Sequence, residues 1–402
     1  MAKRILIYTN HFYPEQFKIN EIVDWICSDD FDVRVITCIP NYPDGNFFKK
    51  YTYNLRFTNY NNLIINRLPL IPRLSGTKFM LSLNYITYFI SCLIFTIYIA
   101  VFKKKYDIIF VHHTSPFLIA INPILYSIFH RRTKKFLWDL DLWPESLEAI
   151  GIIKSKLILN LIKNLVKYIY SYYDKILIGS NNFKKIIAKR FDKEIIYFPN
   201  WADKEIENNI TIPKIKVDLP ENKFVVMYTG NIGKAQNLIS LLKTINLLKN
   251  DNIYWTFIGG GRYKELFIKK LRNAGLIDNC RFIEHIPVKK IPSYVKYANA
   301  LFLSLSNEKI FYNTVPAKLQ SYMAMGKPII GVMSGEGAEI IKKSQCGFVI
   351  ENYDYTELAF KIRDLSKMSS DELDKFGLNG KNFYKKNFNI EMRRNQIIKI
   401  LS

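Results

Sequence analysis

A buried-strand pattern that runs directly into a glycine turn decides the fold, at Phe224-Val-Val-Met-Tyr-Thr-Gly-Asn-Ile-Gly233. The apolar run Phe224–Tyr228 is typical of a strand that is buried on both faces of a parallel sheet. The glycines after it let backbone amides approach an anion, and we expect a helix to follow, whose dipole favours negative charge at its start. A tight strand–helix turn without a ligand explains the same residues, so this motif alone leaves both interpretations open.

Twelve further apolar runs of this kind are separated by helical stretches along the chain. They are 4–9, 32–38, 63–67, 107–112, 135–139, 175–179, 195–198, 254–258, 280–283, 300–304, 328–332 and 347–350. Such alternation, restarting near Pro199, predicts an α/β protein of two doubly wound, Rossmann-like domains that face a cleft. We expect the domains at 1–200 and 201–386, with a helix at 387–402 that packs back toward the N-terminal domain.

The charge distribution points to a membrane surface. The 402 residues include 58 Lys and Arg against 35 Asp and Glu, for a net charge of +23. Residues 45–106 and 108–138 contain basic side chains and no acid. A basic and apolar stretch fits anionic lipid better than nucleic acid, for which no motif is present, although composition bias also produces such a charge. The hydrophobic share of 49% excludes a mainly disordered chain.

Residues 79–102 carry no charge and precede Lys103-Lys104-Lys105, so by length they are a candidate membrane span. Runs predicted to be strands of one parallel sheet lie on both sides of this segment, and a crossing helix would separate them. We therefore expect a helix that lies on the sheet or enters the membrane interface, with a buried helix and a true span as alternatives.

The second chemical motif is Thr314-Val-Pro-Ala-Lys-Leu-Gln-Ser-Tyr-Met-Ala-Met-Gly326. Pro316 and Gly326 are start and stop signals of a helix of about ten residues. Its N-terminus is suited to a diphosphate, with Lys318 in the first turn. Structural needs explain the proline and the glycine, but not a lysine among apolar neighbours.

The third motif, Trp138-Asp-Leu-Asp-Leu-Trp-Pro-Glu-Ser146, follows a strand. The carboxylates of Asp141 and Glu145 suit sugar hydroxyls or proton transfer, and Trp143 suits stacking on a sugar face. A helix cap with core tryptophans is the alternative. Weaker signals at strand ends are the glycine turn with Gly260 and Arg262, the carboxylate Glu339, and a set of residues in the first half, namely His11, Glu15 and His113.

Together these motifs resemble the retaining GT-B glycosyltransferases of family 4, in the bacterial fucosamine and colanic-acid-type branch that builds O-antigens, capsules and exopolysaccharides. The resemblance covers nearly the whole chain. It runs through Phe12–Asn20, Ile39–Gly45, Asp141–Ser146, Phe198–Trp201, Gly230–Gly233, Pro316–Tyr322 and Gly335–Glu339.

The resemblance implies that the C-terminal domain holds the nucleotide diphosphate and the N-terminal domain the acceptor. The implied donor-binding residues are Gly230, Asn231, Ile232, Gly233, Lys234, Gly260, Arg262, Thr314, Val315, Pro316, Gln320, Ser321 and Glu339. The implied acceptor-binding residues are His11, Glu15, Asn20, His113 and Trp143. The implied catalytic residues are Asp141, Glu145, Lys318 and Glu308. The chain departs from the family where two glutamates are usual, since Asn313 and Ser321 stand there; Glu308 is the nearest substitute for the first.

The expected activity is transfer of an N-acetylated or 6-deoxy hexosamine, such as N-acetylfucosamine, from a UDP-sugar to a polyprenyl-diphosphate-linked saccharide. We expect it at the cytoplasmic face of the inner membrane, without a metal or other cofactor. A GDP-sugar transferase and a non-catalytic membrane partner of a glycan-assembly complex are the alternatives. A nucleotide-dependent oxidoreductase is disfavoured because the first strand leads into Tyr8-Thr-Asn-His-Phe-Tyr-Pro14, which has no glycine.

Overall fold

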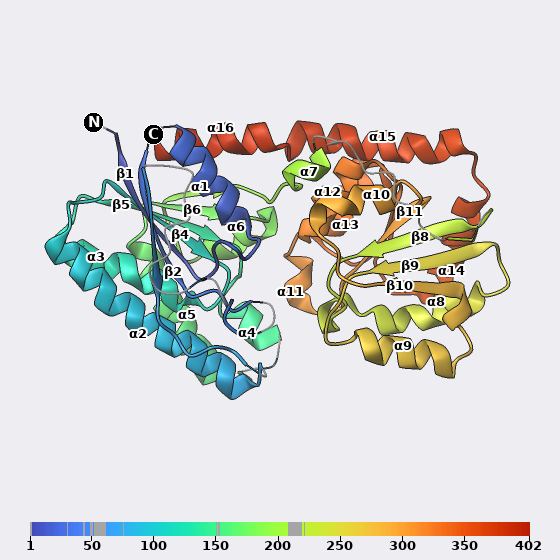
Figure 1. Ribbon diagram of the computed structural model, residues 1–402, viewed down its shortest axis with the longest axis horizontal. Coiled ribbons are helices and arrows are strands. Elements are labelled where there is room, and N and C mark those ends of the chain that lie inside the picture. Colours follow the sequence, from blue (N-terminus) through green and yellow to red (C-terminus); the bar gives the residue numbers. More distant parts are fainter. Residues whose placement is uncertain are drawn as a thin grey trace. The chain divides into compact units, whose positions relative to one another are not determined.

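The computed structural model describes residues 2–29, 31–42, 45–48, 51, 62–74, 76–149, 151, 153–207, 219–220 and 222–402. The chain divides into two compact units (Figure 1). The first unit comprises Met1–Pro199 together with Arg394–Ser402, and the second comprises Asn200–Arg393. Pro43 and Asp44 of the motif Ile39–Gly45 lie outside the described residues, as do Lys49, Lys50 and Arg56 of the basic stretch 45–106 and the segment 208–218.

The first unit is built on a parallel sheet with the strand order β3-β2-β1-β4-β5-β6-β7. The strands are β1 (Arg4–Thr9), β2 (Asp32–Cys38), β3 (Leu63–Leu68), β4 (Ile108–His113), β5 (Lys134–Asp139), β6 (Lys175–Ile178) and β7 (Glu194–Tyr197). Its helical elements are α1 (Lys18–Ser28), α2 (Lys78–Phe102), η1 (Phe117–Ile121), α3 (Asn122–Phe129), α4 (Glu145–Ala149), α5 (Lys156–Ser171) and α6 (Asn181–Ile187). The chain leaves β1 toward β2 and leaves β4 toward β5, in opposite directions. The boundary between β1 and β4 is therefore the switch point at which open α/β sheets bind ligands.

The second unit repeats this plan with a parallel sheet in the order β10-β9-β8-β11-β12-β13. Its strands are β8 (Phe224–Thr229), β9 (Ile253–Ile258), β10 (Cys280–Ile283), β11 (Ala300–Ser304), β12 (Ile329–Val332) and β13 (Gly347–Ile350). Its α-helices are α7 (Lys204–Glu207), α8 (Leu242–Leu247), α9 (Lys264–Asn273), α10 (Ile291–Val295), α11 (Lys309–Tyr312), α12 (Ala317–Met325), α13 (Glu336–Ser344), α14 (Tyr355–Ser366) and α15 (Ser370–Asn387). Short 3₁₀ turns are η2 (Lys234–Gln236), η3 (Leu238–Leu241), η4 (Ile277–Asn279) and η5 (Val288–Lys290). Here the switch point lies between β8 and β11.

The two doubly wound sheets confirm the predicted GT-B fold class. Each of the thirteen predicted strands overlaps one strand of the structure, with ends that agree within one residue. The agreement follows from burial, because a parallel strand covered on both faces has to be apolar along its whole length.

The last helix, α16 (Ile390–Leu401), starts in the second unit and ends in the first. Within the first unit, the Arg394 guanidinium pairs with Asp29 at 2.9 Å, and the Gln396 amide donates to the Tyr197 carbonyl at 2.9 Å. Residues from both ends of the chain therefore complete the first unit.

Helix α2 packs against its own unit along one stripe of buried side chains, namely Asn84, Tyr88, Cys92, Thr96, Ile99 and Ala100. The Tyr88 hydroxyl donates to the Thr9 carbonyl at 3.0 Å, and the Thr96 hydroxyl lies 3.0 Å from the Tyr8 hydroxyl. Among the described residues, Phe79–Phe102 is the one segment whose length and composition would suffice to cross a membrane, and 28% of its most apolar window is buried. The hydrogen bonds to β1 hold this helix against the sheet.

Candidate active site

The predicted donor-binding segments meet at the carboxyl edge of the second sheet, around its switch point. The loop after β9 touches the loop after β8 so closely that a Cβ on Gly259 would lie 2.2 Å from the Gly230 oxygen. Gly259 has a φ of +132°, which also favours glycine. The loop after β11 joins them where the Ser306 amide donates to the Ala235 carbonyl at 2.7 Å. Three loops and the start of α12 therefore surround one position.

Lys318 reaches this position from the first turn of α12. Its ammonium donates a hydrogen bond to the Tyr228 hydroxyl and lies 4.1 Å from the centre of the Tyr228 ring. A Cβ on Gly230 would lie 2.5 Å from Lys318 Cε, so the lysine occupies space that only a glycine leaves open. Burial lowers the pKa of Lys318 to about 7. An anion beside the amine would favour its charged form.

Tyr228 links the lysine to the glycine loop, a role that the sequence analysis did not predict. Its hydroxyl accepts from Lys318 and donates to the Asn231 carbonyl at 2.5 Å. Burial raises the pKa of Tyr228 well above its usual value, so the hydroxyl stays neutral. In the sequence this tyrosine is one apolar position of a buried strand, and only the contact with α12 shows its second function.

A helix follows Gly233 as expected, but it does not start at the glycine turn. The three-residue turn η2 comes first, Asn237 adopts a left-handed conformation with a φ of +47°, and η3 and α8 then follow. The amides of the loop also have partners within the protein. Gly230 N–H donates to the Ile258 carbonyl at 2.8 Å, Ile232 N–H to the Gly260 carbonyl at 2.7 Å, and Gly233 N–H to Gln236 Oε1 at 3.0 Å. Lys318 and the N-terminus of α12 are thus the stronger candidates for holding phosphate.

Other predicted donor-site residues surround this centre with different degrees of engagement. Lys234 Nζ lies 3.9 Å from Glu308 Oε1, and both side chains are partly exposed. The Thr314 hydroxyl donates to the Ile310 carbonyl at 3.0 Å. The buried Gln320 amide group donates to the carbonyl oxygens of Pro316 and Ala317, at 3.0 and 3.1 Å, so it braces the first turn of α12.

The remaining predictions for this site divide by exposure. Val315 is buried, Ser321 is half-buried and Arg262 is exposed. Glu339 is exposed and lies 3.7 Å from Lys343, whereas Glu336, at the start of the same helix, is buried. Of the two acids in this motif, Glu336 is the one that α13 holds inside the unit.

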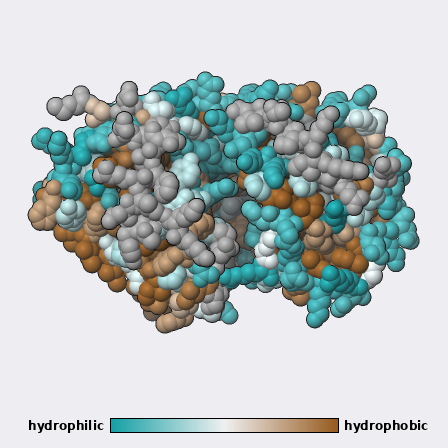
Figure 2. All heavy atoms as spheres, viewed as in Figure 1, coloured by the Kyte–Doolittle hydropathy of each residue, from teal (hydrophilic) through white to brown (hydrophobic). Residues whose placement is uncertain are grey.

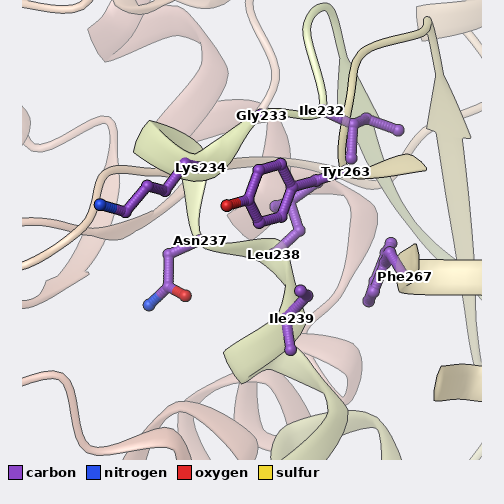
Figure 3. Close-up of a pocket in the computed structure, with 8 residues that line it drawn as sticks. All are labelled: Ile232, Gly233, Lys234, Asn237, Leu238, Ile239, Tyr263 and Phe267. Atoms are coloured by element: carbon purple, nitrogen blue, oxygen red, sulfur yellow. The ribbon is translucent and has the colours of Figure 1, made fainter. Parts of the chain in front are cut away.

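A small pocket of about 50 Å³ adjoins the loop after β8. Figure 3 shows the polar ends of Lys234, Asn237 and Tyr263 on one side of it and the side chains of Ile232 and Phe267 on the other. Leu238, Ile239 and Gly233 complete the lining. The hollow therefore has one polar and one apolar side beside the loop after β8.

In the first unit, the predicted acceptor residues after β1 form one buried network. His11 Nδ1 lies 2.5 Å from Glu15 Oε2, and Glu15 Oε1 accepts from the amides of Asn41 and Tyr42 at 2.8 Å each. The Asn20 amide group donates to the Glu15 carbonyl at 2.7 Å. With both carboxylate oxygens engaged, Glu15 fixes the loop and positions His11.

Arg73, which the sequence analysis did not single out, faces this network. Its Nη2 lies 3.3 Å from His11 Nε2. Because a guanidinium only donates, this contact makes Nε2 an acceptor and places the imidazole proton on Nδ1, toward Glu15. The guanidinium also lies over the rings of Tyr42 and Tyr85, at 5.5 and 5.4 Å. It is a partly exposed cation at the first switch point.

A second network follows β4 and β5. His113 Nδ1 lies 2.7 Å from Asp139 Oδ1, and the Tyr170 hydroxyl donates to Asp139 Oδ2 at 2.5 Å. All three side chains are fully buried. His113 and Asp139 therefore lie in the interior of the unit, at the ends of β4 and β5. Asp141 follows Asp139 by two residues.

Asp141 and Glu145 differ in their availability. Trp143 Nε1 donates to Asp141 Oδ2 at 3.3 Å and to Ser115 Oγ at 3.2 Å. Burial raises the pKa of Asp141 above its usual value, which suits a group that exchanges a proton. Glu145 instead binds the Arg190 guanidinium through both oxygens, and Arg190 also donates to the Trp143 carbonyl at 2.8 Å. Of these two acids, Asp141 is the better candidate for direct contact with a substrate.

Within the described part of the chain, no group of three His, Cys, Asp or Glu side chains is placed to hold a metal ion.

Known proteins resemble this chain in sequence. Residues 210–383 match the family described as Glycosyl transferases group 1, which is less than half of the chain. The chain is 28% identical over 243 residues to WbjE of Pseudomonas aeruginosa, which is named as a glycosyltransferase; the match covers 56% of this chain and 57% of WbjE. It is 24% identical over 339 residues to WcaI of Escherichia coli (strain K12), which is named as a colanic acid biosynthesis glycosyl transferase; that match covers 80% of this chain and 81% of WcaI.

Solved structures agree over the whole fold. A sucrose-phosphate synthase from Thermosynechococcus elongatus has a TM-score of 0.72 at 14% identity, covering 100% of this chain and 98% of the other. HepE of Anabaena, solved with UDP and glucose, has a TM-score of 0.67 at 12% identity, covering 100% and 99%. Residues 210–383 are thus similar to group 1 glycosyl transferases, and the solved structures share the fold of the whole chain. Lys318 lies inside the matched group 1 segment.

Gly230→Ala tests the space around Lys318. The new Cβ would meet Lys318 Cε, and the φ of +115° would strain an alanine. We expect a loss of about 1 kcal/mol or more in the free energy of unfolding, and weaker binding of nucleoside diphosphate. Gly260→Ala is the matched control for stability, because a Cβ there meets nothing within 4 Å. Its unfolding free energy should stay within about 0.5 kcal/mol of wild type. Equal stability of both variants in denaturant titrations would contradict this account.

Binding of a diphosphate should take up a proton. The Lys318 amine, with its pKa lowered to about 7, is mostly neutral at about pH 8, where a nucleoside diphosphate is fully ionised. The bound anion raises that pKa, so affinity should fall as the pH rises above about 7. Calorimetry in two buffers of different ionisation enthalpy measures the uptake. Lys318→Met should abolish it, and Lys249→Met, at an exposed lysine of the same unit, should keep it. Wild-type binding without proton uptake would refute the prediction.

Proposed function

We propose that this protein is a retaining glycosyltransferase that transfers a sugar from a UDP-sugar to a polyprenyl-diphosphate-linked saccharide, in the synthesis of O-antigen, capsule or exopolysaccharide. The proposed sugar is an N-acetylated or 6-deoxy hexosamine such as N-acetylfucosamine, and the proposed location is the cytoplasmic face of the inner membrane. The name of WbjE supports glycosyl transfer, and the name of WcaI supports a role in the synthesis of a bacterial polysaccharide such as colanic acid. HepE, solved with UDP, supports the choice of the nucleotide.

The observation that carries the donor side of the proposal is the placement of Lys318 against Gly230 and Tyr228. Stabilising the departing diphosphate is the main catalytic task in such a transfer, and a preorganised cation serves it without a metal. The amides of the first turn of α12 lack partners one turn earlier in the helix and add to the favourable potential. Retention would follow from attack on the donor face that the diphosphate leaves, with a phosphate oxygen as the base.

On the acceptor side we propose that Asp141 binds the attacking hydroxyl. Trp143 would stack on the acceptor sugar, and Arg190 would keep Glu145 and the Trp143 backbone in position. Arg73, a partly exposed cation beside His11, is the proposed contact for phosphate of the lipid carrier. These roles place acceptor chemistry at the switch point of the first sheet.

Two alternatives to this proposal are included in the test of the donor. The chain lacks the usual glutamate pair, with Asn313 and Ser321 in its place, which favours a non-catalytic partner of a glycan-assembly complex as the second candidate. A GDP-sugar (fucose or mannose) is the alternative donor.

Thermal unfolding of the detergent-purified protein with UDP, GDP, ADP, CMP or TDP, each with and without EDTA, tests the donor. A ligand at about 100 times its Kd adds roughly 2.7 kcal/mol of stability. We expect UDP alone to stabilise the protein and EDTA to change nothing. Stabilisation by GDP alone would replace the donor with a GDP-sugar, and loss of the effect with EDTA would require a metal. No stabilisation by any of the five would favour the non-catalytic partner.

Lys318→Ala tests the catalytic role. Loss of one group that stabilises developing charge lowers kcat by about 10²–10³-fold. We expect the melting temperature to change far less than turnover does. Parallel measurement of donor hydrolysis and thermal unfolding decides this. Equal loss of folding and activity would remove Lys318 from the mechanism.

A further inference from the structure

Three helices of the first unit, α2, α3 and α5, share one face of the sheet. The connections β3-α2-β4, β4-α3-β5 and β5-α5-β6 all cross the sheet in one direction, whereas β1-α1-β2 crosses in the other. Since such crossovers are right-handed, the first three lie on one face. The turn η1 contacts all three helices, which makes them neighbours.

These helices expose large apolar side chains that no described part of the unit covers. On α2 they are Phe79, Ile86, Ile90, Ile94, Ile97, Tyr98, Val101 and Phe102, and on α3 they are Ile128 and Phe129. Phe79 and Phe102 are 73% and 71% exposed. Figure 2 shows hydrophobic surface gathered over α2 and α3. A patch of this kind on one face marks an interaction surface.

Helix α5 adds a second apolar ridge, which the sequence analysis did not single out. Its buried stripe is Leu159, Val166, Ile169 and Tyr170, and it packs inside the unit. A different stripe at intervals of four, four and three residues, Leu157, Leu161, Leu165 and Tyr168, is exposed; Leu157 is 72% and Leu161 is 61% exposed. A helix on the surface of a domain needs one apolar stripe to pack on that domain, so the exposed stripe of α5 is available for another contact.

Basic side chains border these ridges. The ends of α2 and α3 are followed by exposed Lys103, Lys104, Lys105, Arg131 and Arg132, and the segment of α5 carries exposed Lys154, Lys156, Lys163 and Lys167. Neither residues 108–138 nor residues 153–171 include an Asp or a Glu. Apolar ridges with a basic border complement the acyl boundary and the anionic headgroups of a bilayer, whereas a second copy of the chain would bring like charges together.

We infer that α5, together with α2 and α3, docks the first unit on an anionic phospholipid bilayer, with the helices lying in the interface and none of them spanning. The inner stripes of α2 and α5 remain on the protein, so lipid meets only their outer faces. The inference rests on the proposed function for its purpose, because docking would bring the acceptor site to a lipid-linked saccharide. Binding to lipid is measurable without that reaction.

Vesicle flotation of the full chain tests the docking. Wild type should float with vesicles of phosphatidylglycerol and phosphatidylcholine, and less with phosphatidylcholine alone or at high salt. The double variant Leu161→Ser/Leu165→Ser should bind the anionic vesicles at least about tenfold more weakly. Lys163→Gln and Lys167→Gln should each weaken that binding about fivefold, and only for anionic vesicles. The matched control is Leu378→Ser in the second unit, where the leucine is 58% exposed; it should bind like wild type.

Two further measurements keep docking separate from catalysis and from folding. Thermal stabilisation by nucleotide should be the same in the α5 double variant and in wild type, which shows an intact fold and donor site. Failure of wild type to float, or flotation of the α5 variant at wild-type strength, would overturn the docking even if nucleotide binds. A self-associating wild type that becomes monomeric with the α5 variant and ignores vesicles would assign the ridge to a second copy of the chain.

Discussion

Lys318 reaches the edge of the second sheet because two neighbouring backbones carry no side chain there. Gly230 leaves the space for its methylene chain, and Gly259 allows the loop after β9 to touch the Gly230 carbonyl. A longer residue at either place would separate the loops that surround the switch point. Through this close approach the end of β8, the glycine turn and the start of α12 lie together. The amine of Lys318 is buried there, where the proposed function expects a negatively charged leaving group.

The sequence was sufficient for the sheets, and it singled out Lys318 as a candidate, because both signals are local. A parallel strand is apolar along its length, and a lysine among apolar neighbours stands out in any context. Tyr228 and Arg190 were missed for the opposite reason. Tyr228 has the appearance of a core residue until α12 lies beside it, and Arg190 is 45 positions from Glu145, so no local pattern pairs them. The helix expected after Gly233 starts later than the glycine turn, because Asn237 adopts a left-handed conformation before η3 and α8.

Carboxylates of the first unit show how the position of an acid decides its chemistry. Glu15 and Glu145 are saturated, the first by two backbone amides and His11, the second by Arg190. Burial raises the pKa of Asp141, and its carboxylate accepts a hydrogen bond from the Trp143 indole of the same motif. Two acids of one motif thus differ in role. Glu145 holds the loop in place, whereas Asp141 is the candidate for contact with a substrate.

The assignment of residues 394–402 to the first unit has a consequence for biosynthesis. A chain emerging from the ribosome delivers β1 to β7 long before α16, yet Arg394 and Gln396 pair with Asp29 and with Tyr197 in that unit. The first unit can complete its native contacts only after residues 394–402 have been translated. The exposed apolar side chains of α2 and α5 would therefore be available to a lipid surface before the first unit has made all of its native contacts.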